Sequence, residues 1–363
     1  MRVTFLLPMR PVEPIGGFRV VYQYANGLAR LGHDVQVVHP ARLRQHPPVL
    51  PRRPRALVGH LRARARSAAA RVRRTDRRLT WQDMDPRVEL AFVSTLHARH
   101  IRTGEVVFAT SWETAEYVGE LPPDRGRPFY LIQHHETWSG SEARVDATWR
   151  LPLHKVFVAQ WLFDKAQAMG LRDTTLISTA IDTELFRVVA PLTERKPRVA
   201  MMYSPHAWKG TDVGLAALEL AKQQAPGLEA VIFGVTPRPS QAPPWVVSHQ
   251  RPTPEVLVRE IYNASSIYLC PSFAEGWHLP PAEAMACGCA LVSTDIQGVH
   301  GYAEHGRNAI LCAPGDAQAL ADGLLTLLRD DARRRLMAAQ AAQKMQSFSW
   351  DRSCAELDRL LRT

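Results

Sequence analysis

Short apolar runs recur along the chain and alternate with segments of helical or turn character. The first run, residues 3–7, precedes a loop rich in proline and glycine and then apolar positions at Val21, Tyr24 and Leu28. That spacing places the apolar side chains on one face of a helix, and a second run follows at 35–39. The order strand, helix, strand predicts a βαβ unit with a right-handed crossover.

The same alternation continues to the end of the chain. In the first half we expect further strands at 88–93, 106–110, 129–133, 155–159 and 175–179. The segment 181–198 shows no clear period and combines proline with charge, so it is expected to connect two halves. In the second half we expect strands at 198–204, 229–234, 266–270, 290–294 and 308–313, with helices between and after them. Alternating strands and helices predict an α/β fold with parallel sheets.

Length and composition agree with this picture. The 363 residues are enough for about two domains, and the hydrophobic share of 46% is that of a globular protein. The opening residues MRVTFLLPM are too short for a secretory signal, and no apolar run approaches the ~20 residues of a membrane-spanning helix. The five cysteines lack the spacing of a metal site. We therefore expect a cytoplasmic protein with reduced cysteines.

The basic charge is concentrated in one segment. Residues 52–78 contain eleven arginines and one acid, Asp76, and so account for the whole net charge of +10. This arginine-rich arm, about residues 41–80, is either a solvated insert or a peripheral contact with the inner face of a membrane, because anionic lipid attracts basic residues. Nucleic-acid binding is disfavoured, since the arm lacks interleaved aromatic residues for base stacking.

The stretch Pro271–Ala290, PSFAEGWHLPPAEAMACGCA, combines two acids with a turn and a helix. It follows the strand expected at 266–270, so its loop lies at the carboxyl end of a strand, where open α/β sheets bind ligands. The two prolines suit a first helical turn, and the free amides of a helix N-terminus attract anions. With Glu275 on the loop and Glu283 expected in the first helical turn, the stretch predicts a site for an anionic ligand that carries hydroxyls.

Two further candidates lie in the first half. Gly16 and Gly17 follow the first strand and let the backbone approach a ligand, although they do not form the GxGxxG fingerprint. His134 and His135 follow the strand at 129–133, again at a carboxyl end. Histidines in this place are either structural residues or ligand contacts, and the pattern leaves both interpretations open.

Several segments together resemble the retaining family 4 glycosyltransferases, which have the GT-B fold. EGWHLPPAEAMACGC resembles the Glu-x7-Glu signature of that family, and IGGFRVVYQYANGLARLGHDVQVV resembles its amino-terminal glycine loop and helix. Further similarities are found in ISTAIDTELF, WKGTDVGLAALELA, HGRNAILCAPGDAQALADGLLTLL and FSWDRSCAEL. The resemblance spans nearly the whole chain except the arm. It implies an α/β GT-B fold of two Rossmann-like, doubly wound domains that face a central cleft.

The resemblance also implies a division of the chain into three parts. Residues 1–180 would form an acceptor domain that carries the arginine-rich arm. Residues 181–348 would form the domain that binds the nucleotide-sugar donor, and residues 349–363 a helix that crosses back to the first domain.

The resemblance assigns roles to particular residues. Glu275, Lys209 and His134 are the expected catalytic residues: Glu275 and His134 would lie near the donor sugar, and Lys209 would neutralise the diphosphate leaving group. The expected donor-binding residues are Gly16, Gly17, Ser204, Gly276, Trp277, His278, Leu279 and Glu283. The amides of Gly276 to Leu279 would meet sugar and phosphates, and Glu283 would accept hydrogen bonds from the ribose hydroxyls.

The implied partners are a UDP-, GDP- or dTDP-linked sugar and a hydroxyl of a glycan, lipid-linked or small-molecule acceptor. No cofactor and no metal are expected, because a lysine and helix amides supply the positive field. Asp83-Met84-Asp85 matches a metal motif of a different glycosyltransferase fold and is interpreted as a chance match. The alternatives are a protein that binds nucleotide sugars without transfer, and an epimerase or phosphorylase on the same architecture.

One departure from the family bears on the donor site. Tyr203 and Ser204 stand where the family has an arginine shortly before the lysine. The diphosphate would then lose a fixed guanidinium, and His206, Arg19 or the arm would have to compensate for it.

Overall fold

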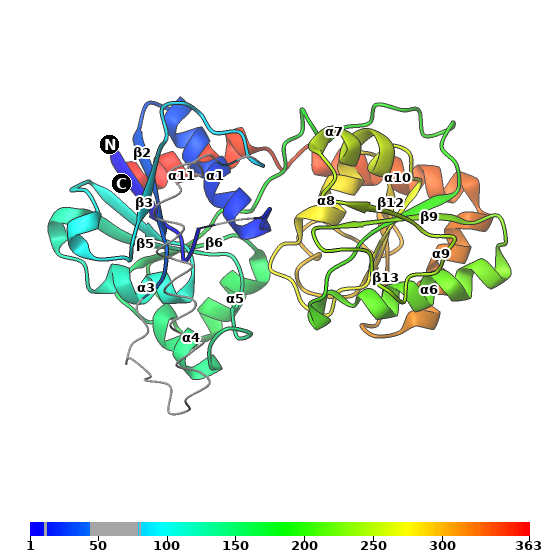
Figure 1. Ribbon diagram of the computed structural model, residues 1–363, viewed down its shortest axis with the longest axis horizontal. Helices are drawn as coiled ribbons and strands as arrows, with labels where there is room; N and C mark the ends of the chain where they lie inside the picture. The colour runs from blue at the N-terminus through cyan, green and yellow to red at the C-terminus, as the bar shows by residue number, and fades with distance from the viewer. Residues whose placement is uncertain (11–12, 44–78, 80) are drawn as a thin grey trace. The chain divides into compact units, whose positions relative to one another are not determined.

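The computed structural model describes residues 1–10, 13–43, 79 and 81–363. Most of the arginine-rich arm, and the predictions made for it, therefore lie outside the described residues. The chain forms two compact units (Figure 1). The first comprises Met1–Phe157, Ala166–Thr175 and Glu356–Thr363, and the second comprises Val158–Lys165 and Leu176–Ala355.

The first unit is built on a seven-stranded sheet with the order β3-β2-β1-β4-β5-β6-β7. The strands are β1 Arg2–Leu6, β2 Asp34–Pro40, β3 Glu89–Val93, β4 Val106–Ala109, β5 Arg127–Ile132, β6 His154–Phe157 and β7 Thr174–Leu176. The pairs from β3 to β6 are parallel. This order is that of a doubly wound fold, because β2 and β4 lie on opposite sides of β1. The strands predicted for the first half are confirmed.

Within the described residues, four α-helices connect these strands. They are α1 Gly16–Arg30, α3 Trp112–Gly119, α4 Glu142–Trp149 and α5 Gln160–Ala168. The sequence placed Gly16 and Gly17 in a loop, but they form the first turn of α1. The reason is that the Ile15 carbonyl already accepts hydrogen bonds from the amides of Phe18 (3.1 Å) and Arg19 (3.0 Å).

The second unit repeats the doubly wound plan with six strands in the order β10-β9-β8-β11-β12-β13, all paired in parallel. They are β8 Arg198–Met202, β9 Glu229–Gly234, β10 Val247–Gln250, β11 Ile267–Cys270, β12 Ala290–Thr294 and β13 Ala309–Cys312. Five of these strands were predicted, and β10 was missed. It lies at the sheet edge and carries a single apolar residue, Val247, so no hydrophobic run marks it.

Helices cover both faces of the second sheet. They are α6 Thr211–Gln224, α7 Pro254–Val256, the π-helix η4 Leu257–Tyr262, α8 Leu279–Ala286, α9 Ala317–Arg329 and α10 Asp331–Met345. The last helix, α11 Trp350–Arg362, ends in the first unit, which includes Glu356–Thr363. In Figure 1, α8 and α10 lie on one face of the sheet and α6 and α9 on the other. Side chains of the sheet and of α6 and α9 form one buried core, which includes Leu218, Leu269, Val292 and Leu324.

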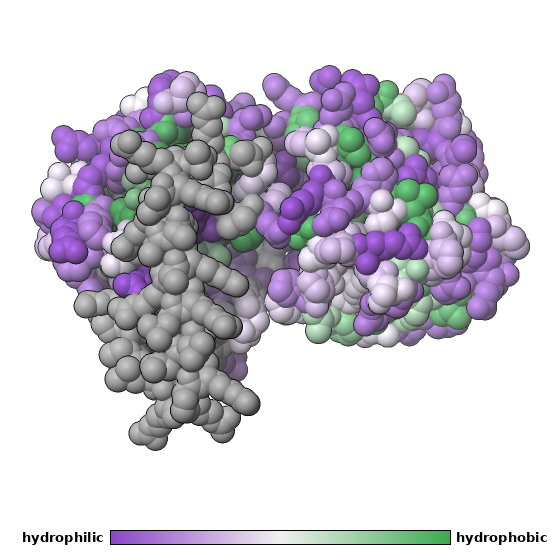
Figure 2. All heavy atoms as spheres, viewed as in Figure 1, coloured by the Kyte–Doolittle hydropathy of each residue, from purple (hydrophilic) through white to green (hydrophobic). Residues whose placement is uncertain are grey.

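The surface is more polar than the core. Figure 2 shows polar side chains over much of the visible face of the described residues, with hydrophobic ones scattered among them. None of the helices in the described part of the chain is long and apolar enough to cross a membrane.

Each sheet has one place where the strand order reverses. In the first sheet it lies between β1 and β4, and in the second between β8 and β11. Doubly wound sheets bind ligands outside the carboxyl ends of the strands at this point. The fold therefore directs attention to the loops that leave β1, β8 and β11.

Candidate functional site

Two loops of the second unit meet at the carboxyl ends of β8 and β11, which are neighbouring strands. Residues 203–210 leave β8, and residues 271–278 leave β11. The Phe273 amide donates a 2.7 Å hydrogen bond to the Trp208 carbonyl. This bond joins the two loops directly above the point where the strand order reverses.

Two glycines allow the backbone to pack this closely. The φ of Gly210 is 62°, and a Cβ there would lie 2.0 Å from the carbonyl oxygen of Pro271. A Cβ on Gly298 would lie 2.7 Å from the Cβ of Glu275. Since real atoms do not approach so closely, both positions require glycine. The two glycines therefore fix the backbone on either side of Glu275.

Lys209 and Glu275 form an ion pair between the two loops. Lys209 Nζ lies 2.7 Å from Glu275 Oε1 and 2.9 Å from Oε2. The Glu275 side chain is 9% exposed and that of Lys209 19%. Burial raises the pKa of Glu275 above its ordinary value, and the Lys209 ammonium offsets part of this rise. Two of the three predicted catalytic residues are thus brought together as a partly buried, bidentate pair.

The imidazole of His278 lies against the same carboxylate. Its Nε2 is 3.3 Å from Glu275 Oε1, and its Nδ1 is 3.3 Å from Cys270 Sγ. Burial, and then the charge of Lys209, lower the pKa of His278 well below its ordinary value, so the ring is neutral at neutral pH. The sequence placed His278 at the site only through its backbone amide. The contact of its ring with Glu275 is a tertiary feature that the motif does not show.

Glu283 lies in α8, but not in its first turn as predicted. The helix begins at Leu279, so Glu283 is its fifth residue. The residue is 4% exposed, and its Oε2 accepts a 3.3 Å hydrogen bond from the Tyr262 hydroxyl. The two acids of the signature therefore have different surroundings: Glu275 faces an ammonium and an imidazole, and Glu283 faces a phenol.

The turn between the two acids buries the side chains of Trp277 and His278. The Trp277 side chain is 4% exposed and packs against the rings of Tyr302 (5.0 Å) and Phe348 (5.4 Å). The N-cap residue of α8, His278, makes no side-chain hydrogen bond to the helix. The amides of this turn, which include those of Gly276 and Leu279, are the groups expected to bind an anion.

The positions that lack the family's arginine are engaged elsewhere. The Tyr203 hydroxyl donates to the Thr236 carbonyl. The Ser204 amide and carbonyl bond the Thr211 hydroxyl at 3.0 and 2.8 Å. These contacts start α6 and contribute no positive charge. Lys209 is therefore the cation that loop 203–210 brings to Glu275.

The predicted residues of the first unit follow β1 and β5. Gly16 and Gly17 open α1, whose N-cap Ile15 makes no side-chain hydrogen bond to the helix. A Cβ on Gly17 would lie 3.4 Å from Oε1 of Gln133, the residue before His134. The glycine turn and the end of β5 therefore lie side by side at the carboxyl edge of the first sheet.

His134 lies beside an aromatic residue that the sequence analysis missed. The rings of His134 and Trp138 are 4.5 Å apart and nearly perpendicular, and Trp138 is 50% exposed. An exposed indole presents a large apolar face with one polar edge. Its signal in the sequence is an aromatic residue in a polar loop just after a strand.

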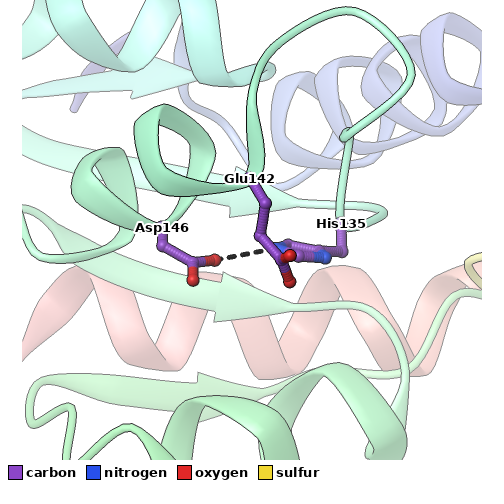
Figure 3. A group of neighbouring side chains, drawn as sticks. All are labelled: His135, Glu142 and Asp146. Atoms are coloured by element: carbon purple, nitrogen blue, oxygen red, sulfur yellow. Dashed lines mark hydrogen bonds and ion pairs between the residues drawn. The ribbon is translucent and has the colours of Figure 1, made fainter.

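Next to it lies the cluster of Figure 3, formed by His135, Glu142 and Asp146. Glu142 reaches from the first turn of α4 toward the His135 ring. One ligand atom from each residue lies within 4.8 Å of the others, and within the described ranges this is the group that could hold a metal ion.

The cluster is closed by a hydrogen bond. His135 Nε2 lies 2.7 Å from Asp146 Oδ1, whereas two ligands of one tetrahedral zinc ion lie about 3.3 Å apart. The contact therefore orients the His135 ring, and a metal ion would have to break it. The expectation that no metal is needed stays a prediction.

A further acid that the sequence analysis missed is Glu136, directly after the two histidines. Its Oε2 accepts a 2.8 Å hydrogen bond from the Trp112 amide, at the start of α3. Burial raises the pKa of Glu136 to about 8. The carboxyl edge of the first sheet therefore carries an acid that is largely protonated at neutral pH.

Comparison with known proteins identifies the second unit. Residues 197–330 match the family model of the group 1 glycosyl transferases. The O-antigen biosynthesis protein RfbC of Myxococcus xanthus is 26% identical over 269 residues, which are 71% of this chain and 20% of that protein. A D-inositol 3-phosphate glycosyltransferase of Corynebacterium urealyticum is 32% identical over 183 residues, 49% of this chain and 39% of that protein. The chain thus spans between about a fifth and two fifths of the length of these relatives.

Solved structures agree on the fold of the whole chain. Sucrose-phosphate synthase from Thermosynechococcus elongatus has a TM-score of 0.70 at 17% identity, covering 99% of this chain and 98% of that one. Anabaena Alr3699/HepE in complex with UDP and glucose has a TM-score of 0.74 at 15% identity, covering 100% of both chains. At these identities the likeness establishes the fold alone, and it confirms the predicted GT-B class. Residues 197–330 therefore form a domain of the group 1 glycosyl transferase type, and the chain as a whole has the GT-B fold.

Proposed function

We propose that this protein is a retaining glycosyltransferase that moves a hexosyl group from a nucleotide-diphosphate sugar to a hydroxyl of a glycan, lipid-linked or small-molecule acceptor. The observation that carries the proposal is the Lys209–Glu275 ion pair at the β8/β11 switch point, with Glu283 in the adjoining helix. A cation, a carboxylate and a helix N-terminus at one strand edge suit a ligand with both phosphates and hydroxyls.

The chemistry assigns one task to each group. The bond from the sugar C1 to the diphosphate oxygen breaks, and a bond from C1 to the acceptor oxygen forms on the same face, so the anomeric configuration is retained. The acceptor proton passes to the departing diphosphate, whose charge Lys209 and the amides of Gly276 to Leu279 stabilise. Glu275 orients the donor sugar through its hydroxyls, and Glu283 holds the ribose.

The first unit supplies the remaining assignments as proposals. The carboxyl edge of its sheet would bind the acceptor, with Gly16 and Gly17 near phosphate and His134 near the donor sugar. The exposed Trp138 beside His134 offers an apolar face for a sugar ring. The inner face of a membrane remains the proposed location of the arginine-rich arm.

A second candidate function is nucleotide-sugar binding without transfer. It is favoured by the engagement of Tyr203 and Ser204, which leaves no guanidinium at the place where the family has one. Removing one fixed positive group from a phosphate site weakens stabilisation of the leaving group more than binding of the nucleoside.

Two measurements with the purified chain separate these functions. Thermal-shift screening of UDP-, GDP- and dTDP-hexoses identifies the donor, because a ligand of the native state raises its stability. UDP-glucose is the first choice, since Alr3699/HepE was solved with it. NMR of the released sugar then gives the configuration: a retained anomer supports transfer, an epimerised donor supports an epimerase, and binding without turnover supports the second candidate. Repeating the assay with EDTA tests the proposed metal independence.

A further inference from the structure

His278 has a backbone conformation that histidine seldom adopts. Its φ is 61° and its ψ is 86°, which places it in the left-handed region that disfavours residues with a Cβ. Glycine would form this turn without strain. A strained residue at a candidate site points to a contribution from its side chain, and the His278 side chain is 3% exposed.

The two ring nitrogens face different partners. Nδ1 lies beside Cys270 Sγ and Nε2 beside Glu275 Oε1, each at 3.3 Å. Burial raises the pKa of the Cys270 thiol to about 11, so the sulfur keeps its proton at neutral pH. A neutral imidazole has one N–H. If the thiol donates to Nδ1, the ring proton must be on Nε2, facing the carboxylate.

Although Glu275 Oε1 lies 3.3 Å away, Nε2 makes no hydrogen bond in the arrangement described. It is buried, and both Glu275 oxygens are bound by Lys209 at 2.7 and 2.9 Å. A buried polar atom without a partner is rare and calls for an explanation. The explanation would be that Lys209 holds the Glu275 carboxylate before the donor binds and His278 holds it afterwards.

We propose that His278 is a positioning residue whose Nε2–H holds the Glu275 carboxylate when Lys209 turns to the diphosphate of the nucleotide sugar. This inference rests on the proposed function and describes how that site changes when it binds its donor. A diphosphate is more negative than one carboxylate and draws the ammonium toward itself. Glu275 would then be a buried charge without a cationic partner, and the bond from His278 keeps it aimed at the sugar.

The matched variants His278→Gln and His278→Asn separate this role from a purely structural one. The Gln amide nitrogen reaches the place of Nε2 and can still donate to Glu275, whereas Asn reaches only the place of Nδ1. Asn tolerates the left-handed conformation better than Gln. A structural role therefore predicts that Asn is the milder change, and a positioning role predicts the opposite.

We expect kcat for donor turnover to fall by about tenfold or more in His278→Asn, the loss expected for one hydrogen bond to a charged group. His278→Gln should recover most of that loss. The affinity for UDP alone should change less than kcat in both variants, because UDP carries no sugar for Glu275 to orient. Thermal unfolding checks that both variants fold.

A second readout does not depend on turnover. Nitrogen-15 NMR of the imidazole should show the proton on Nε2 in the wild type and in Cys270→Ser, which keeps a donor. Cys270→Val should admit the other tautomer. A ring with its proton on Nδ1, or a His278→Asn variant as fast as His278→Gln, overturns the inference and leaves the transferase assignment intact. A wild-type protein that turns over none of the nucleotide sugars overturns the transferase assignment instead.

Discussion

At the scale of single residues, Glu275 and Glu283 differ in what surrounds them, so their removal should have different effects. We expect Glu275→Gln to lower turnover by about 10²–10³-fold, the loss seen when one group that orients or stabilises the reacting centre is removed. Its nucleotide affinity should change little. Glu283→Gln should instead weaken nucleotide binding about tenfold, the equivalent of ~1.4 kcal/mol.

Steady-state kinetics and calorimetric titration with the nucleotide distinguish the two effects. Glu304→Gln is the matched control, because Glu304 is a partly exposed acid of the same unit that pairs with Arg307. It should leave both quantities unchanged. A fully active Glu275→Gln variant would contradict the proposed catalytic role of Glu275.

Glu136 predicts a pH dependence of stability. Its pKa is raised from 4.5 to about 8 in the folded state, so between these values the folded chain holds a proton that the unfolded chain releases. The stability contributed by this proton is complete below pH 4.5 and is lost as the pH rises through 8. Glu136→Gln can still accept the Trp112 amide but has no proton to lose.

We therefore expect Glu136→Gln to be more stable than the wild type at pH 9, and the advantage to shrink steadily toward pH 5. Urea unfolding at several pH values measures it. Glu120→Gln, a change of an exposed acid of the same unit, is the control. Parallel stability curves for the wild type and Glu136→Gln would contradict the buried, protonated state.

The residues that the sequence could not assign share a physical cause. The motif of one chain segment predicted Glu275 and Glu283, and the similar segment after the neighbouring strand predicted Lys209. The ring of His278 and the carboxyl of Glu136 owe their properties to burial, and Trp138 owes its position to the turn beside His134. Burial depends on what packs against a side chain from elsewhere in the fold, and hydrophobic periodicity does not encode that.

At the scale of elements, the glycine that joins the two loops offers a clean test. Gly210 and Gly306 both have positive φ, but only at Gly210 would a Cβ meet another atom, the Pro271 oxygen at 2.0 Å. Either change to alanine adds a left-handed residue, which costs ~1–2 kcal/mol. The difference between the two variants therefore reports the contact between the loops.

We expect Gly306→Ala to lower the free energy of unfolding by that amount and to leave nucleotide binding intact. Gly210→Ala should lose more stability and also the thermal shift caused by the nucleotide, because the loop that carries Lys209 must move away from the β11 loop. Equal stability and equal nucleotide response in the two variants would show that the loops do not depend on this contact.

Strands and helices were predicted well where buried apolar residues recur regularly along the chain, and poorly where they do not. The inner strands of both sheets are mostly apolar, as parallel strands covered on two faces require. The edge strand β10 has the sequence Val-Ser-His-Gln and gives no such signal. Helix α1 begins at two glycines, residues with low helix propensity, because the amides of Phe18 and Arg19 donate hydrogen bonds to the Ile15 carbonyl.

At the scale of the whole molecule, the proposed donor site does not explain why the basic charge is concentrated in one segment. Residues 52–78, with eleven arginines and Asp76, account for the entire net charge of +10, while the residues of the proposed donor site lie elsewhere in the chain. Deleting this segment should therefore leave donor hydrolysis unchanged and weaken binding to vesicles that contain anionic lipid. Each basic residue near such a surface contributes about 1 kcal/mol, and salt screens the attraction.

Co-sedimentation with phosphatidylserine vesicles, compared with phosphatidylcholine vesicles, measures this contribution at low and high salt. Replacing the eleven arginines with lysine keeps the charge and should keep the binding, whereas replacing them with glutamine should reproduce the deletion. If the lysine variant also fails to bind, the guanidinium geometry matters and the partner presents fixed phosphates rather than a diffuse surface. If the deletion binds anionic vesicles as well as the full chain does, the arm is a solvated insert, and the acceptor must be sought without reference to a membrane.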